Sequence, residues 1–250
     1  MARAIGRGGR DYPDFGVSNP SNTSILITDL SELAARLGSP SYFDRSGVIL
    51  FSETFENGMR DWYATTSGDP AYVRLTAGYV AHGSYAVEME NSGVSTENAY
   101  MRKLLPFPYM STVGFEFHLR HIADGERFVF QTIIYDTDHY HQMIIRIDSV
   151  NEELELQTTE GDYETIDISP YHSGLVSLFH AIKFTVNIDT GTYIRLSVDA
   201  IDYPVNTIPV YTDTPGAQPR IVIYTGLWGS GGEADHIVID NIIVTLDEPS

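Results

Sequence analysis

The sequence contains no cysteine, and this absence excludes disulfide bonds and thiolate metal sites in any compartment. Long apolar runs are also missing, because no stretch approaches the roughly 20 consecutive apolar residues that cross a bilayer. The opening MARAIGRGGRDYPDF carries basic residues without the apolar run of a secretory signal. These absences predict synthesis in the cytoplasm, no membrane partner and no export by the usual signal.

Positive charge is scarce as well. The chain has 15 basic and 34 acidic residues, which gives a formal net charge of −19, and its only lysines are Lys103 and Lys183. Basic and acidic residues balance within residues 1–45, so the acidic excess falls on the rest of the chain. Because an acidic body repels phosphate backbones, we expect no nucleic-acid partner.

Signatures of common enzyme chemistries are missing too. The chain has no G-x-S-x-G elbow, no P-loop and no dinucleotide-binding fingerprint followed by a helix. Carboxylates do occur in pairs, at Glu152 and Glu153 and within GDYETID, residues 161–167. The first pair flanks leucines as a solvated strand face does. We therefore predict no catalytic residues.

What the sequence has in abundance is β-strand character, with 16 tyrosines and 11 phenylalanines. The clearest element is residues 180–205, where apolar and polar positions alternate on both sides of the turn Asp189-Thr190-Gly191-Thr192. This pattern predicts an antiparallel hairpin. Similar short strands separated by turns continue from Val48 to Leu246. The pattern predicts an all-β, antiparallel two-sheet sandwich over residues 46–250.

Residues 1–45 read differently, as an extended N-terminal arm with one short helix. Residues 1–27 are rich in Gly, Ser, Asn and Pro without apolar periodicity, whereas residues 28–37 have a capping pattern and an apolar helical stripe. Arg3, Arg7 and Arg10 suit an acidic surface such as this protein's own. We expect this arm to pack along its own body or to hold copies of the chain or other assembly subunits.

Three blocks of sequence carry a family resemblance. They are FSETFENGMRDW (51–62) with VAHGSYAVEME (80–90), the hairpin of residues 180–205, and HIVIDNIIVTL (236–246). Together they resemble concanavalin A-like and laminin-G-like jelly rolls and the related carbohydrate-binding modules. The resemblance spans roughly residues 48–246 and implies a jelly-roll sandwich. Its short motifs are typical of a fold rather than of one activity.

The resemblance also implies a metal site. In some of these modules the Glu of the opening block and the Asp of the closing strand bind a structural calcium, and the matching positions are Glu56 and Asp240, with Glu53 nearby. Carboxylate oxygens are the ligands that Ca²⁺ prefers, but a complete site needs about six to eight oxygens. The alternative is that these carboxylates accept hydrogen bonds from backbone amides at strand ends.

Four side chains are candidates for contact with a carbohydrate or another partner. His139 and His141 project to the same side of a predicted strand, with Tyr140 between them, and either a two-histidine metal edge or a hydrogen-bonded polar loop fits that spacing. Trp228 lies in a glycine-rich segment, residues 225–233, which reads as a loop. Its indole either stacks on a sugar or partner, or folds back over one end of the sandwich.

Three hypotheses of function follow. The first is a non-catalytic structural or assembly protein anchored through the arm, with an architecture that resembles phage virion accessory proteins such as capsid decoration or lectin-like tail proteins. The second is a glycan-binding, lectin-like module, either alone or as the adhesive part of such an assembly. The third is a polysaccharide-active jelly-roll enzyme, which needs two carboxylates facing each other. Laminarinase-type jelly rolls carry theirs in an E-x-D-x-x-E motif, and this sequence lacks it.

Overall fold

The computed structural model describes Phe43 and residues 47–92, 94, 96–107, 111–121, 127–148, 151, 153–168, 178–199, 201–214, 218–229 and 236–248. The chain divides into two units, residues 1–45 and residues 46–250. The predicted helix and the arm residues Arg3, Arg7 and Arg10 lie outside the described residues, so these expectations stay predictions.

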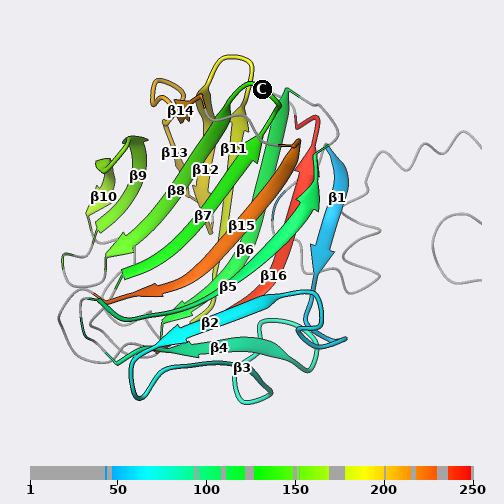
Figure 1. Cartoon of the computed structure of the whole chain (residues 1–250), viewed down its shortest axis with the longest axis vertical. Helices are drawn as coiled ribbons and strands as arrows, with labels where there is room; N and C mark the ends of the chain where they lie inside the picture. The colour runs from blue at the N-terminus through cyan, green and yellow to red at the C-terminus, as the bar shows by residue number, and fades with distance from the viewer. Residues whose placement is uncertain are drawn as a thin grey trace, which may run out of the picture. The chain divides into compact units, whose positions relative to one another are not determined.

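Unit 46–250 is an antiparallel sandwich of two sheets, each with eight strands among the described residues (Figure 1). Sheet A contains, in spatial order, β13 (Ile201–Tyr203), β12 (Thr192–Val198), β11 (His180–Asn187), β6 (Thr112–His121), β16 (His236–Leu246), β4 (Ala86–Glu90) and β3 (Tyr72–Thr76), with β1 (Val48–Glu53) also paired to β16.

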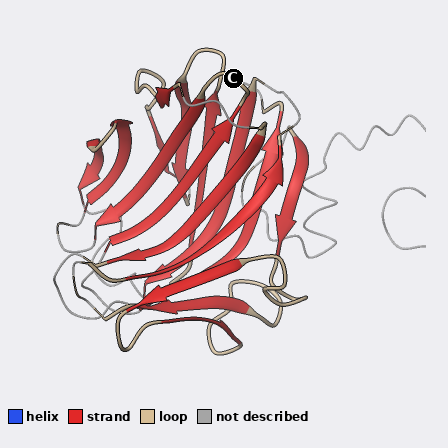
Figure 2. Ribbon diagram, in the orientation of Figure 1, coloured by secondary structure: helices blue, strands red, loops and turns tan. Residues whose placement is uncertain are grey.

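Sheet B is the second layer, and its strands β8, β7 and β15 pass in front of β11 and β12 in the view of Figure 1. It contains, in spatial order, β10 (Asp162–Ile168), β9 (Glu153–Thr159), β8 (Tyr140–Asp148), β7 (Arg127–Tyr135), β15 (Arg220–Trp228), β5 (Asn98–Pro106) and β2 (Tyr63–Ser67), with β14 (Tyr211–Asp213) paired to β8. The ribbon of Figure 2 shows strands, turns and loops in the described part of the chain. None of the described residues forms a helix long and apolar enough to cross a membrane.

The core lies between the two sheets and consists of the apolar half of each alternating strand. Phe117 on β6 stacks on Phe130 on β7, with ring centroids 4.2 Å apart and planes at 5°. Phe184 on β11 lies against Phe115 and Phe130, at 4.9 Å and 6.0 Å between ring centroids. All four rings are fully buried. They tie the sheets together because burial of aromatic surface is the largest favourable contribution to such a core.

The predicted all-β, antiparallel two-sheet jelly-roll sandwich is confirmed, and so is the hairpin of β11 and β12. Its register pairs Phe184 with Leu196 and Asn187 with Thr192, with an irregularity between Thr185 and Val186. One local expectation is wrong, because the segment from Thr225 to Trp228 is the end of β15 and not a loop.

Candidate functional site

Side chains on the outer face of sheet B are more exposed to solvent than those on its core face. Along β7, Phe128, Phe130 and Ile134 are fully buried, whereas the alternate residues Val129 and Gln131 are only half-buried. The outer face therefore presents a surface built on the central strands β5, β15, β7 and β8. A rigid sheet holds such side chains in place better than a loop does.

Four aromatic residues run across β2, β5 and β15 on this face, and we call them the aromatic strip: Tyr63, Tyr100, Tyr224 and Trp228. The ring of Trp228 stacks on Tyr100, with centroids 5.6 Å apart and planes at 15°. Tyr100 in turn contacts Tyr224 at 6.1 Å. Trp228, Tyr100 and Tyr224 are half-buried, and Tyr63 is 61% exposed. Each strip residue is thus anchored in the sheet and keeps part of its ring accessible.

Gly226 makes the close approach of Tyr100 possible. It lies between Tyr224 and Trp228 on the same face of β15 and pairs in register with Tyr100 on β5. A Cβ at Gly226 would lie 2.3 Å from the carbonyl oxygen of Ala99 and 2.5 Å from the Cα of Tyr100. Only glycine fits such a close approach of two backbones.

Ion pairs flank the strip on the side of β8 and β9. Arg127 Nε lies 2.7 Å from Asp148 Oδ2, and Arg146 donates to Glu155 through Nε and through Nη2, the latter at 2.7 Å. Burial alone would raise the pKa of Asp148, but hydrogen bonds from Arg127 and Asn151 hold it below its ordinary value.

Amide and aromatic contacts order the neighbouring part of this face. The guanidinium of Arg146 lies 3.8 Å from the ring centroid of Tyr163. Gln142 Nε2 donates to Gln157 Oε1 at 2.8 Å. These polar groups are therefore held in fixed positions on the same face as the aromatic strip, with β7 between them and β15.

The same face carries a second aromatic group at its other end. Tyr140, at the start of β8, contacts Tyr135 at 6.0 Å and Tyr211 at 5.8 Å between ring centroids. Its hydroxyl donates to that of Tyr211 at 3.3 Å, so both of its neighbours restrain this ring.

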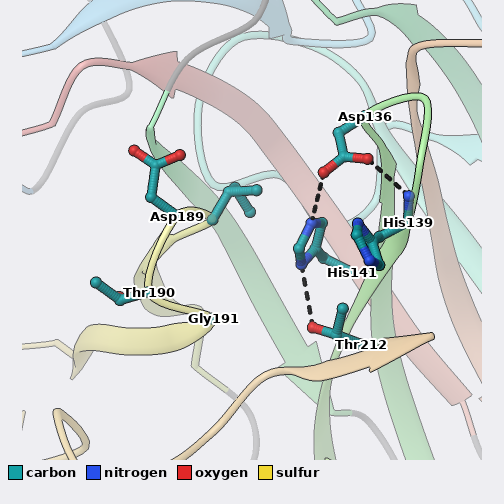
Figure 3. Close-up of a pocket in the computed structure, with 8 residues that line it drawn as sticks. Asp136, His139, His141, Asp189, Thr190, Gly191 and Thr212 are labelled. Atoms are coloured by element: carbon teal, nitrogen blue, oxygen red, sulfur yellow. Dashed lines mark hydrogen bonds and ion pairs between the residues drawn. The ribbon is translucent and has the colours of Figure 1, made fainter. Parts of the chain in front are cut away.

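A pocket of about 420 Å³ lies beside Tyr140, between the β7–β8 turn of sheet B and the β11–β12 turn of sheet A (Figure 3). His141 is held from both sides, since Nε2 lies 3.1 Å from Asp136 Oδ2 and Nδ1 lies 3.1 Å from Thr212 Oγ1. His139 is exposed at the rim, 6.4 Å from His141 between ring centroids.

Asp136 organises the turn that forms one wall of this pocket. Its Oδ1 accepts hydrogen bonds from the backbone N–H groups of Asp138 and His139, at 3.0 and 2.8 Å. Burial would raise the pKa of Asp136, but these hydrogen bonds and that from His141 lower it. His139 and His141 both line this pocket, although His139 precedes β8. Among the described residues, no group of three or more His, Cys, Asp or Glu side chains can hold a metal ion.

The carboxylates proposed for calcium lie around the loop of residues 81–85. Asp240 is fully buried and accepts hydrogen bonds from the backbone of Ala81 and His82, at 3.0 and 3.2 Å. Exposed Glu56 accepts from the backbone of Ser84 and Tyr85, at 2.6 and 3.0 Å. Two of the three predicted residues thus hold one loop.

Glu53 is committed elsewhere, because it accepts hydrogen bonds from Phe55 N at 3.0 Å and from Trp62 Nε1 at 3.1 Å. Burial, with a smaller contribution from the charge of Glu56, raises the pKa of Asp240 to about 6 against the effect of its backbone hydrogen bonds. Beside it, the side-chain amide of Asn241 is buried without a hydrogen-bond partner among the described residues.

The structure separates the four predicted contact residues into two places. Trp228 and Tyr140 share the outer face of sheet B at opposite ends, whereas His139 and His141 line the pocket. Sequence reasoning missed the strip residues Tyr63 and Tyr224, as well as Arg102, which lies between them in register on β5. The available signal was their alternation with core residues, as in N-A-Y-M-R along residues 98–102.

The comparisons with known proteins support the fold. No protein-family model matches the chain, and no curated protein matches it. Among solved structures, the chain is similar to a "Cellulose induced protein, Cip1" (TM-score 0.54, 16% identity, covering 78% of this chain and 96% of that one). It is also similar to an endo-β-1,4-glucuronan lyase from the fungus Trichoderma reesei (TM-score 0.54, 12% identity, 80% and 96%).

A third similar structure is a carbohydrate esterase from the Shiga toxin-encoding bacteriophage phi24B (TM-score 0.51, 13% identity, covering 81% of this chain and 100% of that one). At these identities the likeness establishes the jelly-roll β-sandwich fold and no activity. Some of these proteins are named as enzymes and the first is not, so shared fold does not decide whether this chain is one.

Proposed function

We propose that this protein is a glycan-binding β-sandwich that binds saccharide on the outer face of sheet B. The observation that carries the proposal is the aromatic strip on a sheet face that also carries fixed polar groups. A sugar ring has apolar C–H faces and a rim of hydroxyls, so it is recognised by aromatic surface together with immobile hydrogen-bonding groups. The strip offers the aromatic surface, and the Gln142–Gln157 and Arg146–Glu155 pairs offer the immobile hydrogen-bonding groups.

A binding role also suits the carboxylates on this face. Asp148 is held by Arg127 with its pKa below the ordinary value, whereas a general acid in a glycosidase needs a raised pKa. Glu155 is likewise engaged by Arg146. These ion pairs favour a recognition surface over a hydrolytic pair. Two of the proteins with a similar fold are named for carbohydrate chemistry, which agrees with this proposal. Because one of them comes from a bacteriophage, a more specific form of the proposal is that this chain is the adhesive part of a larger assembly.

Replacing Trp228 with alanine tests the proposal. We expect Trp228→Ala to weaken glycan binding about five- to tenfold, because stacking on one aromatic ring is worth about 1–1.5 kcal/mol. Binding is measured by affinity electrophoresis across a panel of soluble polysaccharides, with Tyr224→Ala as a second strip variant. Val48→Ala serves as the control, because Val48 is an exposed residue on sheet A. If both strip variants stay folded by circular dichroism and bind as tightly as the parent, the proposal is wrong.

We also propose that the loop of residues 81–85 binds Ca²⁺ through Asp240 and Glu56. The buried amide of Asn241 and the raised pKa of Asp240 support this, because a cation offsets the repulsion between the two carboxylates. Ca²⁺ at a hundred times its Kd adds about 2.7 kcal/mol of stability, which is roughly 5–10 °C in Tm for a domain of this size.

Thermal unfolding in Ca²⁺ and in chelator measures that difference. The rise in Tm is expected in the parent and in Glu53→Gln, since Glu53 is committed to Phe55 and Trp62. It is expected to disappear in Asp240→Asn. Equal Tm values of the parent in Ca²⁺ and in chelator exclude the site.

A further inference from the structure

Arg102 differs from two other arginines on the outer face of sheet B. Arg127 pairs with Asp148 and Arg146 pairs with Glu155. Among the residues that the structure describes, no carboxylate forms an ion pair or hydrogen bond with Arg102. The positive charge of this guanidinium is therefore not offset by a neighbouring carboxylate, on a protein whose formal net charge is −19.

The neighbours of Arg102 are aromatic and apolar rather than acidic. In register it lies between Tyr63 on β2 and Tyr224 on β15. Its guanidinium carbon lies 5.1 Å from the ring centroid of Tyr63 and 5.9 Å from that of Tyr224. Along the same face of β5 its neighbours are Tyr100 and Leu104. Cation–π contacts hold a guanidinium in place, but they leave its N–H donors available to a ligand.

The position of Arg102 joins it to the glycan surface. Tyr63 and Tyr224 belong to the aromatic strip, and Arg102 lies between them, half-buried. A saccharide lying on the strip would cover this cation and remove water from it. That desolvation is unfavourable unless the ligand supplies an opposite charge. A planar carboxylate matches the guanidinium through two parallel hydrogen bonds.

We propose that the glycan bound on this face is acidic and that Arg102 pairs with a sugar carboxylate. The inference rests on the proposed glycan-binding function and names its ligand class, which is polysaccharide containing uronic acid or another carboxylated sugar. The ring of the acidic residue packs on the strip while its carboxylate reaches the guanidinium between Tyr63 and Tyr224.

The test compares polygalacturonate with the same polymer after reduction of its carboxyl groups, by affinity electrophoresis or calorimetry with the full chain. We expect the parent to prefer the acidic polymer at least tenfold, with a preference that falls as salt is added. In Arg102→Met this preference falls to nearly one, and in Arg102→Lys it is intermediate, because an ammonium has no planar fork.

Arg220→Met is the matched control. Arg220 is on the same face, is exposed, and lies 4.7 Å from the ring centroid of Tyr135, so its loss removes the same charge away from the strip. We expect this variant to keep most of the preference for the acidic polymer. An equal loss in Arg220→Met and Arg102→Met would mean that general electrostatics, and not a pairing with Arg102, produces the preference.

The remaining outcomes separate this inference from the proposed function. Equal binding of both polymers by the parent, with sensitivity to Trp228→Ala, overturns the acidic ligand and leaves the glycan surface in place. Binding of dextran sulfate, which carries sulfate but no carboxylate, without binding of carboxylated polymers replaces the carboxylate with a sulfate and overturns the inference. Binding of no polysaccharide, acidic or neutral, overturns both the inference and the proposed function.

Discussion

Lys183→Met is expected to lower the free energy of unfolding by about 3–5 kcal/mol, the usual cost of removing one partner of a buried ion pair. Lys183 Nζ lies 2.9 Å from Glu248 Oε1, and the two side chains are 2% and 3% exposed. The same carboxylate oxygen accepts a hydrogen bond from Thr245 at 2.6 Å. Without the ammonium, Glu248 remains buried beside β16 with its charge no longer offset by this cation. Equilibrium unfolding in urea at pH 7 measures the loss.

A double variant separates the ion pair from simple packing. Lys183→Met combined with Glu248→Leu removes both charges of this pair and keeps comparable volume. We expect it to recover part of the lost stability, since buried ion pairs are often replaced by apolar pairs at little cost, whereas Glu116, opposite Lys183 in register and 2% exposed, remains buried beside the new methionine. A loss below about 1 kcal/mol in Lys183→Met contradicts the prediction. A double variant as unstable as the single one would show that packing of the lysine stem, and not its charge, stabilises this region.

The sequence predicts the sandwich well because period-two alternation reports directly which side chains are buried. The hairpin of β11 and β12 is an example, since Phe184 and Val186 occupy the core as their spacing predicts. Alternation says nothing about which strands are neighbours. Tyr100 and Trp228 are far apart in the chain and meet only because β5 pairs with β15, so the aromatic strip was not predictable.

The candidate residues show the same limit. His139 and His141 lie near each other because they belong to one turn and strand, but the pocket beside them needs the turn of Asp189, which belongs to the other sheet. Asp240 and Glu56 both accept hydrogen bonds from the loop of residues 81–85, although they are far apart in the sequence. Glu53 does not join them, because the indole of Trp62 takes its carboxylate. The local sequence pattern indicates which face of a sheet a residue occupies, whereas the pairing of strands distant in the chain determines which residues form a site.

Residues 226–229, G-L-W-G, resemble a loop in the sequence, but residues 226–228 belong to β15. Position 226 requires glycine because the backbone of β5 passes too close for a Cβ. Gly226→Ala is expected to destabilise the domain by about 3 kcal/mol, the upper part of the usual range for overpacking. The added Cβ would lie 2.3 Å from Ala99 O and 2.5 Å from Tyr100 Cα, and backbone in the middle of a sheet cannot move aside as a flexible side chain can.

The same substitution is expected to weaken glycan binding at least tenfold, because moving β5 away from β15 separates Tyr100 from Trp228 and opens the strip. Urea unfolding and affinity electrophoresis measure the two effects on one variant. Gly226→Ala in a Tyr100→Ala background isolates the cause: the loss of stability should persist, since the nearest clash is with the carbonyl of Ala99. If removing the Tyr100 ring restores stability, the ring and not the backbone limits the approach. If Gly226→Ala keeps full stability and full binding, the two strands lie further apart than their register contacts indicate. The close packing of β5 on β15 would then not be what holds the aromatic strip together.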